Sequence, residues 1–130
     1  MKGFIVPIEQ STLHNEDYRR VLYTGKHLQL VLMSLEVGEE IGEEVHGLDQ
    51  FIRIEEGNAR VVLDGEAYTL ESDNAVVIPE GVRHNVINIG EGKLKLYTIY
   101  TPPEHKDGVV ARTKVEAEAL HEHFDGCTTE

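Results

Sequence analysis

One short segment of the chain contains side chains that could bind a metal ion or move a proton. Glu44 and His46 stand two residues apart, and Gln50 has the same parity further along. In an extended segment such side chains project from one face, so they can share a target. Imidazoles and carboxylates are ligands for divalent transition metals. Because the preceding run EVGEEIGEE is acidic, a solvated loop is the alternative interpretation of Glu44, and a buried amide bonded to the backbone is that of Gln50.

A second histidine, His84, follows a tight turn and begins another apolar segment. The turn reads PEGVR and the segment after it reads HNVIN, so Val86 and Asn88 share the face of His84 in a strand. His84 can therefore point inward from the first residue of a strand. An ordinary turn histidine is the alternative interpretation.

The elements that must position these residues are predicted to be short β-strands. Strand patterns cover residues 20–24, 27–37, 51–56, 75–79, 83–89 and 93–101, and a hairpin covers 59–70. The hairpin turn is predicted at Asp64-Gly65, a pair typical of primed turns. Since no helical period occurs before residue 110, the pattern favours an antiparallel sandwich or barrel.

The end of the chain is predicted to be a crossing loop followed by one short helix. Residues 102–112 contain two prolines and a glycine, which favour a loop over a strand. Thr113 and Glu116 have the spacing of a capping box, and VEAEALHEHF follows as helix. His121 and His123 would then point in different directions, so they are not expected to form a chelating pair.

The composition limits the partners and the compartment. The 130 residues are expected to form one domain, and 12 basic against 24 acidic residues give a net charge of -12. Nucleic acid and anionic membrane surfaces should therefore be repelled. No apolar run approaches the roughly 18 residues of a membrane span, and none at the start resembles a signal peptide. The single cysteine, Cys127, excludes an internal disulfide, so a reducing cytoplasm is the expected location.

The two polar segments resemble the two sequence motifs of the cupin superfamily. The first motif is Gly, five residues, His-x-His, three or four residues, Glu, six residues and Gly, and it is matched in spacing by Gly38, Glu44, His46, Gln50 and Gly57. The second is Gly, five residues, Pro-x-Gly, two residues, His, three residues and Asn, matched by Asp73, Pro79, Gly81, His84 and Asn88. The resemblance covers roughly residues 28–101. It implies an all-β jelly-roll barrel (double-stranded β-helix) with one metal ion near its mouth.

Three positions depart from the cupin pattern. Glu44 replaces the first motif histidine, Gln50 replaces the motif glutamate, and Asp73 replaces a glycine at a turn. The implied metal ligands are therefore Glu44, His46 and His84, with Gln50 as a weak fourth ligand or as a hydrogen-bonding neighbour. The formal charge of this set equals that of the family pattern. It suits one divalent ion among iron, manganese, nickel, cobalt and zinc.

The resemblance implies a small metalloenzyme that acts on an oxygenated small organic molecule. Isomerisation or elimination and dioxygenation are both compatible with such a site. His105 in the crossing loop could act as a general acid or base, although an exposed loop histidine is the commoner case. Tyr100 could assist from its strand, with core packing as its alternative. A cupin that binds a metal or small ligand without turnover, and a cavity that binds no metal, are the rival hypotheses.

The resemblance also suggests how the chain is organised. Residues 1–27 would form an N-terminal arm and first strand, 28–101 the barrel, and 102–130 the loop, helix and polar tail. The segment LQLVLMSL is apolar on both faces, so one face can fill the barrel while the other meets a partner subunit. Cupins commonly pair through sheet faces, and a homodimer is expected.

Overall fold

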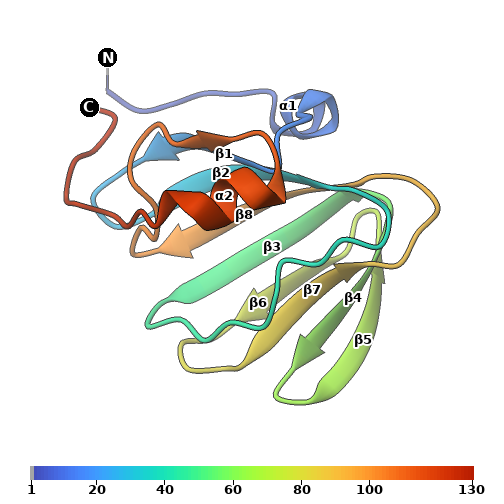
Figure 1. Cartoon of the computed structure of the whole chain (residues 1–130). Helices are drawn as coiled ribbons and strands as arrows, with labels where there is room; N and C mark the ends of the chain where they lie inside the picture. The colour runs from blue at the N-terminus through green and yellow to red at the C-terminus, as the bar shows by residue number, and fades with distance from the viewer. Residues whose placement is uncertain (1) are drawn as a thin grey trace.

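The computed structural model describes residues 2–130, which form two antiparallel sheets that face each other, with a short helix near each end of the chain (Figure 1). The larger sheet has the strand order β6-β3-β8-β2-β1-β9. Its strands are β1 (Arg19–Thr24), β2 (Gln29–Leu35), β3 (Asp49–Glu56), β6 (Ala75–Ile78), β8 (Leu94–Thr101) and β9 (Val110–Ala111). The smaller sheet has the order β5-β4-β7, with β4 (Asn58–Leu63), β5 (Glu66–Glu71) and β7 (His84–Asn88). The predicted two-sheet β architecture is confirmed.

The core lies between the two sheets because alternate residues of each strand point inward. In β3 the predicted row of Gln50, Ile52 and Ile54 is buried. Ile54 stands opposite Leu96 of β8, which stands opposite Met33 of β2, and all three side chains are buried. Directly opposite residues share a face, so each row across the larger sheet is either wholly internal or wholly external.

The hairpin between β4 and β5 forms at the predicted place. Asp64 and Gly65 both have positive φ angles, 47° and 87°, as a primed two-residue turn requires. The substituted motif position Asp73 also has a positive φ, 79°. Aspartate tolerates this conformation better than most residues, which explains how it can replace the family's glycine.

Two helices and one strand differ from the sequence expectation. Helix α1 (Ile8–His14) was not predicted, because it is a single short segment that buries only Thr12 and shows no sustained period. Strand β9, two residues long, lies in the predicted crossing loop. Helix α2 (Lys114–Leu120) begins as predicted, with the Glu116 amide donating to Thr113 Oγ1 at 3.1 Å.

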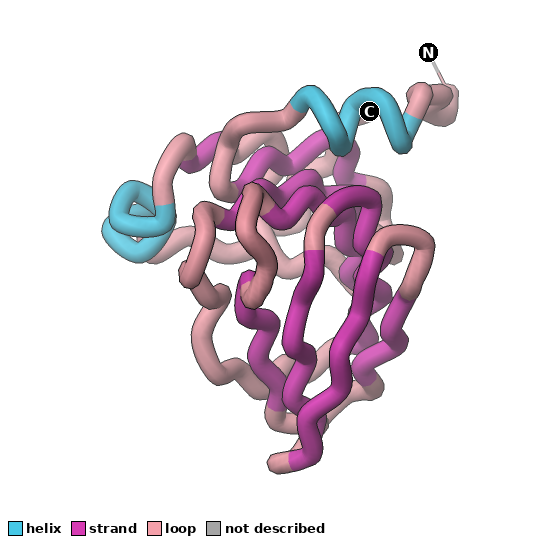
Figure 2. The backbone as a smooth tube through the Cα atoms, turned by 90° about the vertical axis from the view of Figure 1, so that its right-hand side faces the viewer, coloured by secondary structure: helices cyan, strands magenta, loops and turns pink. Residues whose placement is uncertain are grey.

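The prediction that the helix continues through HEHF was wrong. His121 adopts the left-handed conformation that ends α2, so His121 and His123 lie beyond the helix, and both are exposed. Figure 2 shows both helices outside the strands. No helix in residues 2–130 combines the length and the apolar character needed to cross a bilayer.

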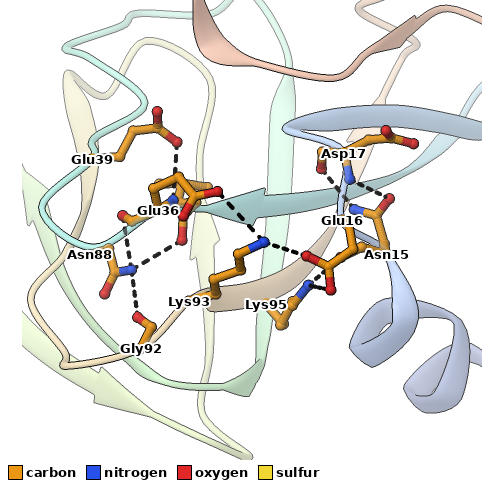
Figure 3. A network of polar contacts seen from close by, with 10 residues as sticks. Asn15, Glu16, Asp17, Glu36, Glu39, Asn88, Gly92, Lys93 and Lys95 are labelled. Carbon is orange, nitrogen blue, oxygen red and sulfur yellow. Dashed lines mark hydrogen bonds and ion pairs between the residues drawn. The ribbon is translucent and has the colours of Figure 1, made fainter.

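A polar network joins the segment after α1 to the start of β8 (Figure 3). Lys95 is only 3% exposed, and its ammonium donates to the Asn15 carbonyl and lies 3.3 Å from Glu16 Oε1. Lys93 also pairs with Glu16. The contacts with Lys93 and then Lys95 lower the pKa of Glu16 below its ordinary value of 4.5.

Replacing Glu16 by glutamine is expected to lower the melting temperature at pH 7. A carboxyl group whose pKa is lowered on folding stabilises the protein above its unfolded pKa, and that stabilisation is lost as the pH falls through the folded pKa. The difference between wild type and Glu16→Gln should therefore shrink below about pH 4.5 and then vanish. Thermal unfolding monitored by circular dichroism from pH 7 to pH 3 measures this. A constant difference across that range, or an equal effect of Glu71→Gln on the exposed face of β5, would contradict the assignment.

The same view shows the role of the motif asparagine. The side-chain amide of Asn88 donates to the carbonyls of Leu35, Glu36 and Gly92 at 2.9 to 3.1 Å (Figure 3). Asn88 therefore ties β7 to the loop that follows β2. That loop contains Glu44.

Candidate metal centre

The loop between β2 and β3 is held against β7 by backbone hydrogen bonds. The Glu44 amide donates to the His84 carbonyl at 2.8 Å, and the His84 amide donates to the Glu44 carbonyl at 2.9 Å. Further along, the Ile41 amide donates to the Val86 carbonyl at 2.9 Å. Two segments far apart in the sequence are thus fixed in register, so their side chains meet at one end of the barrel.

This pairing brings together three potential metal ligands. One ligand atom each from Glu44, His46 and His84 lies within 4.8 Å of the other two. Glu44 Oε2 and His46 Nε2 are 3.7 Å apart, and the rings of His46 and His84 have centroids 5.1 Å apart. One small cation between these atoms could contact all of them.

The protonation pattern of the histidines suits a cation. His84 Nδ1 lies 2.9 Å from the Val82 carbonyl, which can only accept, so Nδ1 carries the hydrogen and Nε2 has a free lone pair. Nε2 of His84 and Nε2 of His46 are both buried and have no hydrogen-bond partner within residues 2–130. Buried polar atoms normally have a partner. The donor set therefore fits a divalent metal ion, with two neutral imidazoles and one carboxylate.

Comparison with known proteins identifies the fold family. The family model described as a cupin domain matches residues 31–100. The chain belongs to the cupin family. The predicted jelly-roll barrel with a short C-terminal helix is confirmed, with the addition of α1.

Similar proteins share most of this cupin chain. The uncharacterized protein YrkC of Bacillus subtilis (strain 168) is 45% identical over 128 residues, which are 93% of this chain and 69% of that protein. An uncharacterized protein of Acanthamoeba polyphaga mimivirus is 43% identical over 113 residues, 82% of this chain and 70% of the relative. The crystal structure of BH2720 from Bacillus halodurans is 46% identical, with a TM-score of 0.90 and coverage of 92% of this chain and 96% of that one.

The charges at the cupin site influence one another strongly. The contact with the Glu44 carboxylate raises the pKa of His46, against the effect of burial. Burial alone would raise the pKa of Glu44, but the contact with His46 and the charges of His46, His84 and Arg19 lower it overall. A proton on His46 therefore competes with a cation for this place.

A second carboxylate stands behind His46. Glu104, in the loop after β8, places Oε2 at 3.6 Å from His46 Nδ1. Gln29 of β2 fixes this loop, because its Oε1 accepts from the amides of Glu104 at 3.2 Å and His105 at 2.9 Å. A carboxylate near the distal nitrogen of a metal-binding histidine orients the ring and increases its basicity.

Replacing Glu104 by glutamine is expected to weaken zinc binding about ten-fold, because His46 loses the charge that orients it. Competition with a chromophoric chelator at pH 7.5 measures the affinity. Glu80→Gln, an exposed change in the turn before β7, provides the matched control. An unchanged affinity in Glu104→Gln would show that the 3.6 Å contact does not influence the site.

Gln50 lies in the interior but plays a different part from the three clustered groups. Its Nε2 donates to Thr98 Oγ1 at 3.0 Å, while its Oε1 is buried and has no partner within residues 2–130. Gln50 stands opposite Tyr100 in the sheet, and the Tyr100 ring packs edge-on to His46 at 6.0 Å. Gln50 thus shares an interior row with a residue that contacts His46, and its role as a ligand or a neighbour stays a prediction.

His105 and Tyr100, the two predicted catalytic residues, lie next to each other. His105 is 7% exposed, so the exposed-loop alternative was wrong for this residue. Its Nδ1 donates to Glu122 Oε1 at 2.7 Å, and its Nε2 is buried without a partner in the described chain. The rings of His105 and Tyr100 meet edge-on at 5.2 Å. Tyr100 therefore packs against both His105 and His46.

Three charged residues near the site were not predicted: Arg19, Glu104 and Glu122. No local pattern marks them, because β1 pairing and the fold of the C-terminal segment bring them to the barrel mouth. The nearest signal is HEHF, because the glutamate between its two histidines is Glu122, which contacts His105.

Proposed function

We propose that this cupin is a metal-dependent enzyme acting on an oxygenated small organic molecule. The observation that supports this most is the convergence of two buried, unpartnered imidazole nitrogens with the Glu44 carboxylate. The Glu44 side chain is 38% exposed, so the centre is reachable from solvent. When bound, a divalent ion would act as a Lewis acid toward a substrate that chelates it through adjacent oxygens.

The side chains near the centre favour proton transfer, and we propose isomerase or lyase chemistry. The Glu122 carboxylate contacts Nδ1 of His105, so Nε2 is the ring nitrogen available for proton transfer, as a general base requires. Burial raises the pKa of Tyr100, so its hydroxyl keeps its proton at neutral pH and can donate to a substrate oxygen. Together these groups could remove a proton from carbon and stabilise the resulting enolate.

Exchange of substrate hydrogens in heavy water tests this function. Protein loaded with manganese or zinc would be incubated with enolisable diketones and uronates, and exchange would be followed by proton NMR. We expect metal-dependent exchange that His105→Ala reduces at least about 100-fold and His123→Ala leaves unchanged. Oxygen uptake by the iron-loaded protein would indicate dioxygenation. Metal binding with neither exchange nor oxygen uptake would support a binding module without turnover.

We also propose that the protein is a homodimer that pairs through the outer face of the larger sheet. Leu30, Ile99, Phe51 and Val77 stand side by side on that face, and Val77 is 63% exposed. An apolar row of this kind is typical of an interface. Light scattering should give twice the chain mass, whereas a monomer of 14.6 kDa at all concentrations would refute the dimer.

A further inference from the structure

We infer that Arg19 binds a carboxylate group of the substrate inside the barrel, beside the metal centre. The inference rests on the proposed function and narrows its substrate class to small organic acids. Arg19 is the first residue of β1.

The sheet register directs Arg19 inward. It stands opposite Met33 of β2 and Ala111 of β9, both of which are buried on the inner face. Its guanidinium carbon lies 5.5 Å from the centre of the buried Tyr18 ring. The next residue, Arg20, is exposed on the opposite face and pairs with Asp17 at 3.2 Å. Two neighbouring arginines therefore differ in orientation and in partner.

Arg19 is half-buried, and one nitrogen of its guanidinium lacks a partner in the described part of the chain. Its Nε is buried and has no hydrogen-bond partner within residues 2–130. A buried donor without an acceptor is costly, which makes a ligand with an acceptor oxygen the expected partner of this nitrogen.

The charge of Arg19 acts on the C-terminal segment that holds His105. Burial raises the pKa of Glu122, but the contact with His105 is the main influence that lowers it, and the positive charge of Arg19 adds to that lowering. Glu122 in turn lies 2.7 Å from His105 Nδ1.

The chemistry around Arg19 favours a carboxylate over a phosphate. A planar guanidinium binds a carboxylate through two parallel hydrogen bonds. Glu44 and Glu104 lie beside His46 and Glu122 lies beside His105, and these carboxylates would repel a dianion more strongly than a single negative charge. A substrate could then chelate the metal through two oxygens while its carboxylate pairs with Arg19.

A matched pair of probes tests this inference. Pentane-2,4-dione and 2,4-dioxopentanoate present the same chelating dione, and only the second has a carboxylate. Calorimetric titration would compare them on zinc-loaded and on metal-free protein. We expect wild type to prefer the acid by about ten- to hundred-fold. Arg19→Gln should remove this preference, Arg19→Lys should retain part of it, and Arg20→Gln should retain all of it.

Several results would overturn the inference. The first is that wild type binds the two probes equally. The second is that folded Arg19→Gln keeps the full preference for the acid. The third is that inorganic phosphate displaces the acid more strongly than acetate does. A separate zinc titration distinguishes the two proposals. If zinc does not bind but the metal-free protein keeps an Arg19-dependent preference for the acid, the proposed function fails and the carboxylate site stands. If zinc binds and wild type shows no preference for the acid, the inference about Arg19 fails and the metal centre stands.

Discussion

Replacing His84 by alanine is expected to weaken zinc binding by more than about 100-fold, since loss of a ligand should cost more than loss of a supporting contact. His84 provides one of the two buried imidazole nitrogens at the centre, and its ring is oriented by the Val82 carbonyl. His84→Ala leaves two ligands, Glu44 and His46. The amide oxygen of Gln50 cannot replace the lost imidazole, because an amide oxygen binds weakly.

Competition with a chromophoric chelator measures the loss in His84→Ala. His123→Ala is the matched control, because His123 is exposed beyond α2 and has no place in the cluster. Retention of wild-type affinity by His84→Ala, or an equal loss in His123→Ala, would show that zinc binds elsewhere on the protein.

Replacing Gly57 by alanine is expected to destabilise the fold by about 3 kcal/mol. Gly57 joins β3 to β4 with φ of 100°, a conformation that residues with a Cβ rarely adopt. An added Cβ would also lie 2.9 Å from the Lys93 carbonyl oxygen and 3.2 Å from Leu94 Cα. Both are backbone atoms where the chain enters β8, so relieving the clash requires that the backbone move.

Gly65→Ala separates the effect of backbone strain from the effect of the steric clash. Gly65 has a similar φ, 87°, but an added Cβ there meets no atom within 4 Å. It should therefore cost only the conformational strain, about 1 kcal/mol. Urea unfolding of both variants measures the difference, and equal costs would contradict the close approach of β8 to Gly57.

The sequence predicts β1 to β8 because each has a local cause, whereas the two-residue β9 has none. Alternating apolar residues, punctuated by Gly and Pro, indicate β3, β4, β5 and β8 without any knowledge of their partners. The Asp64-Gly65 turn has a local cause too, because the pair itself favours positive φ. Helix α1 has no such cause, since its seven residues are too few for a period.

The residues of the candidate site also differ in whether a local sequence pattern marks them. Glu44, His46 and His84 are recognisable because motif spacing places them in two defined segments, and the structure brings these three together. Arg19 and Glu122 are not recognisable, because each depends on long-range pairing, through β9 for Arg19 and through the His105 contact for Glu122. The sequence therefore indicates a metal centre and leaves the groups that would select its substrate to the tertiary structure.

Anomalous scattering from crystals soaked in zinc or cobalt tests the central claim most directly. We expect a single strong peak about 2.0 to 2.2 Å from Nε2 of His46, from Nε2 of His84 and from a carboxylate oxygen of Glu44. A peak held by other residues, or none at this place under saturating metal near neutral pH, would contradict the claim that these three side chains form a metal centre.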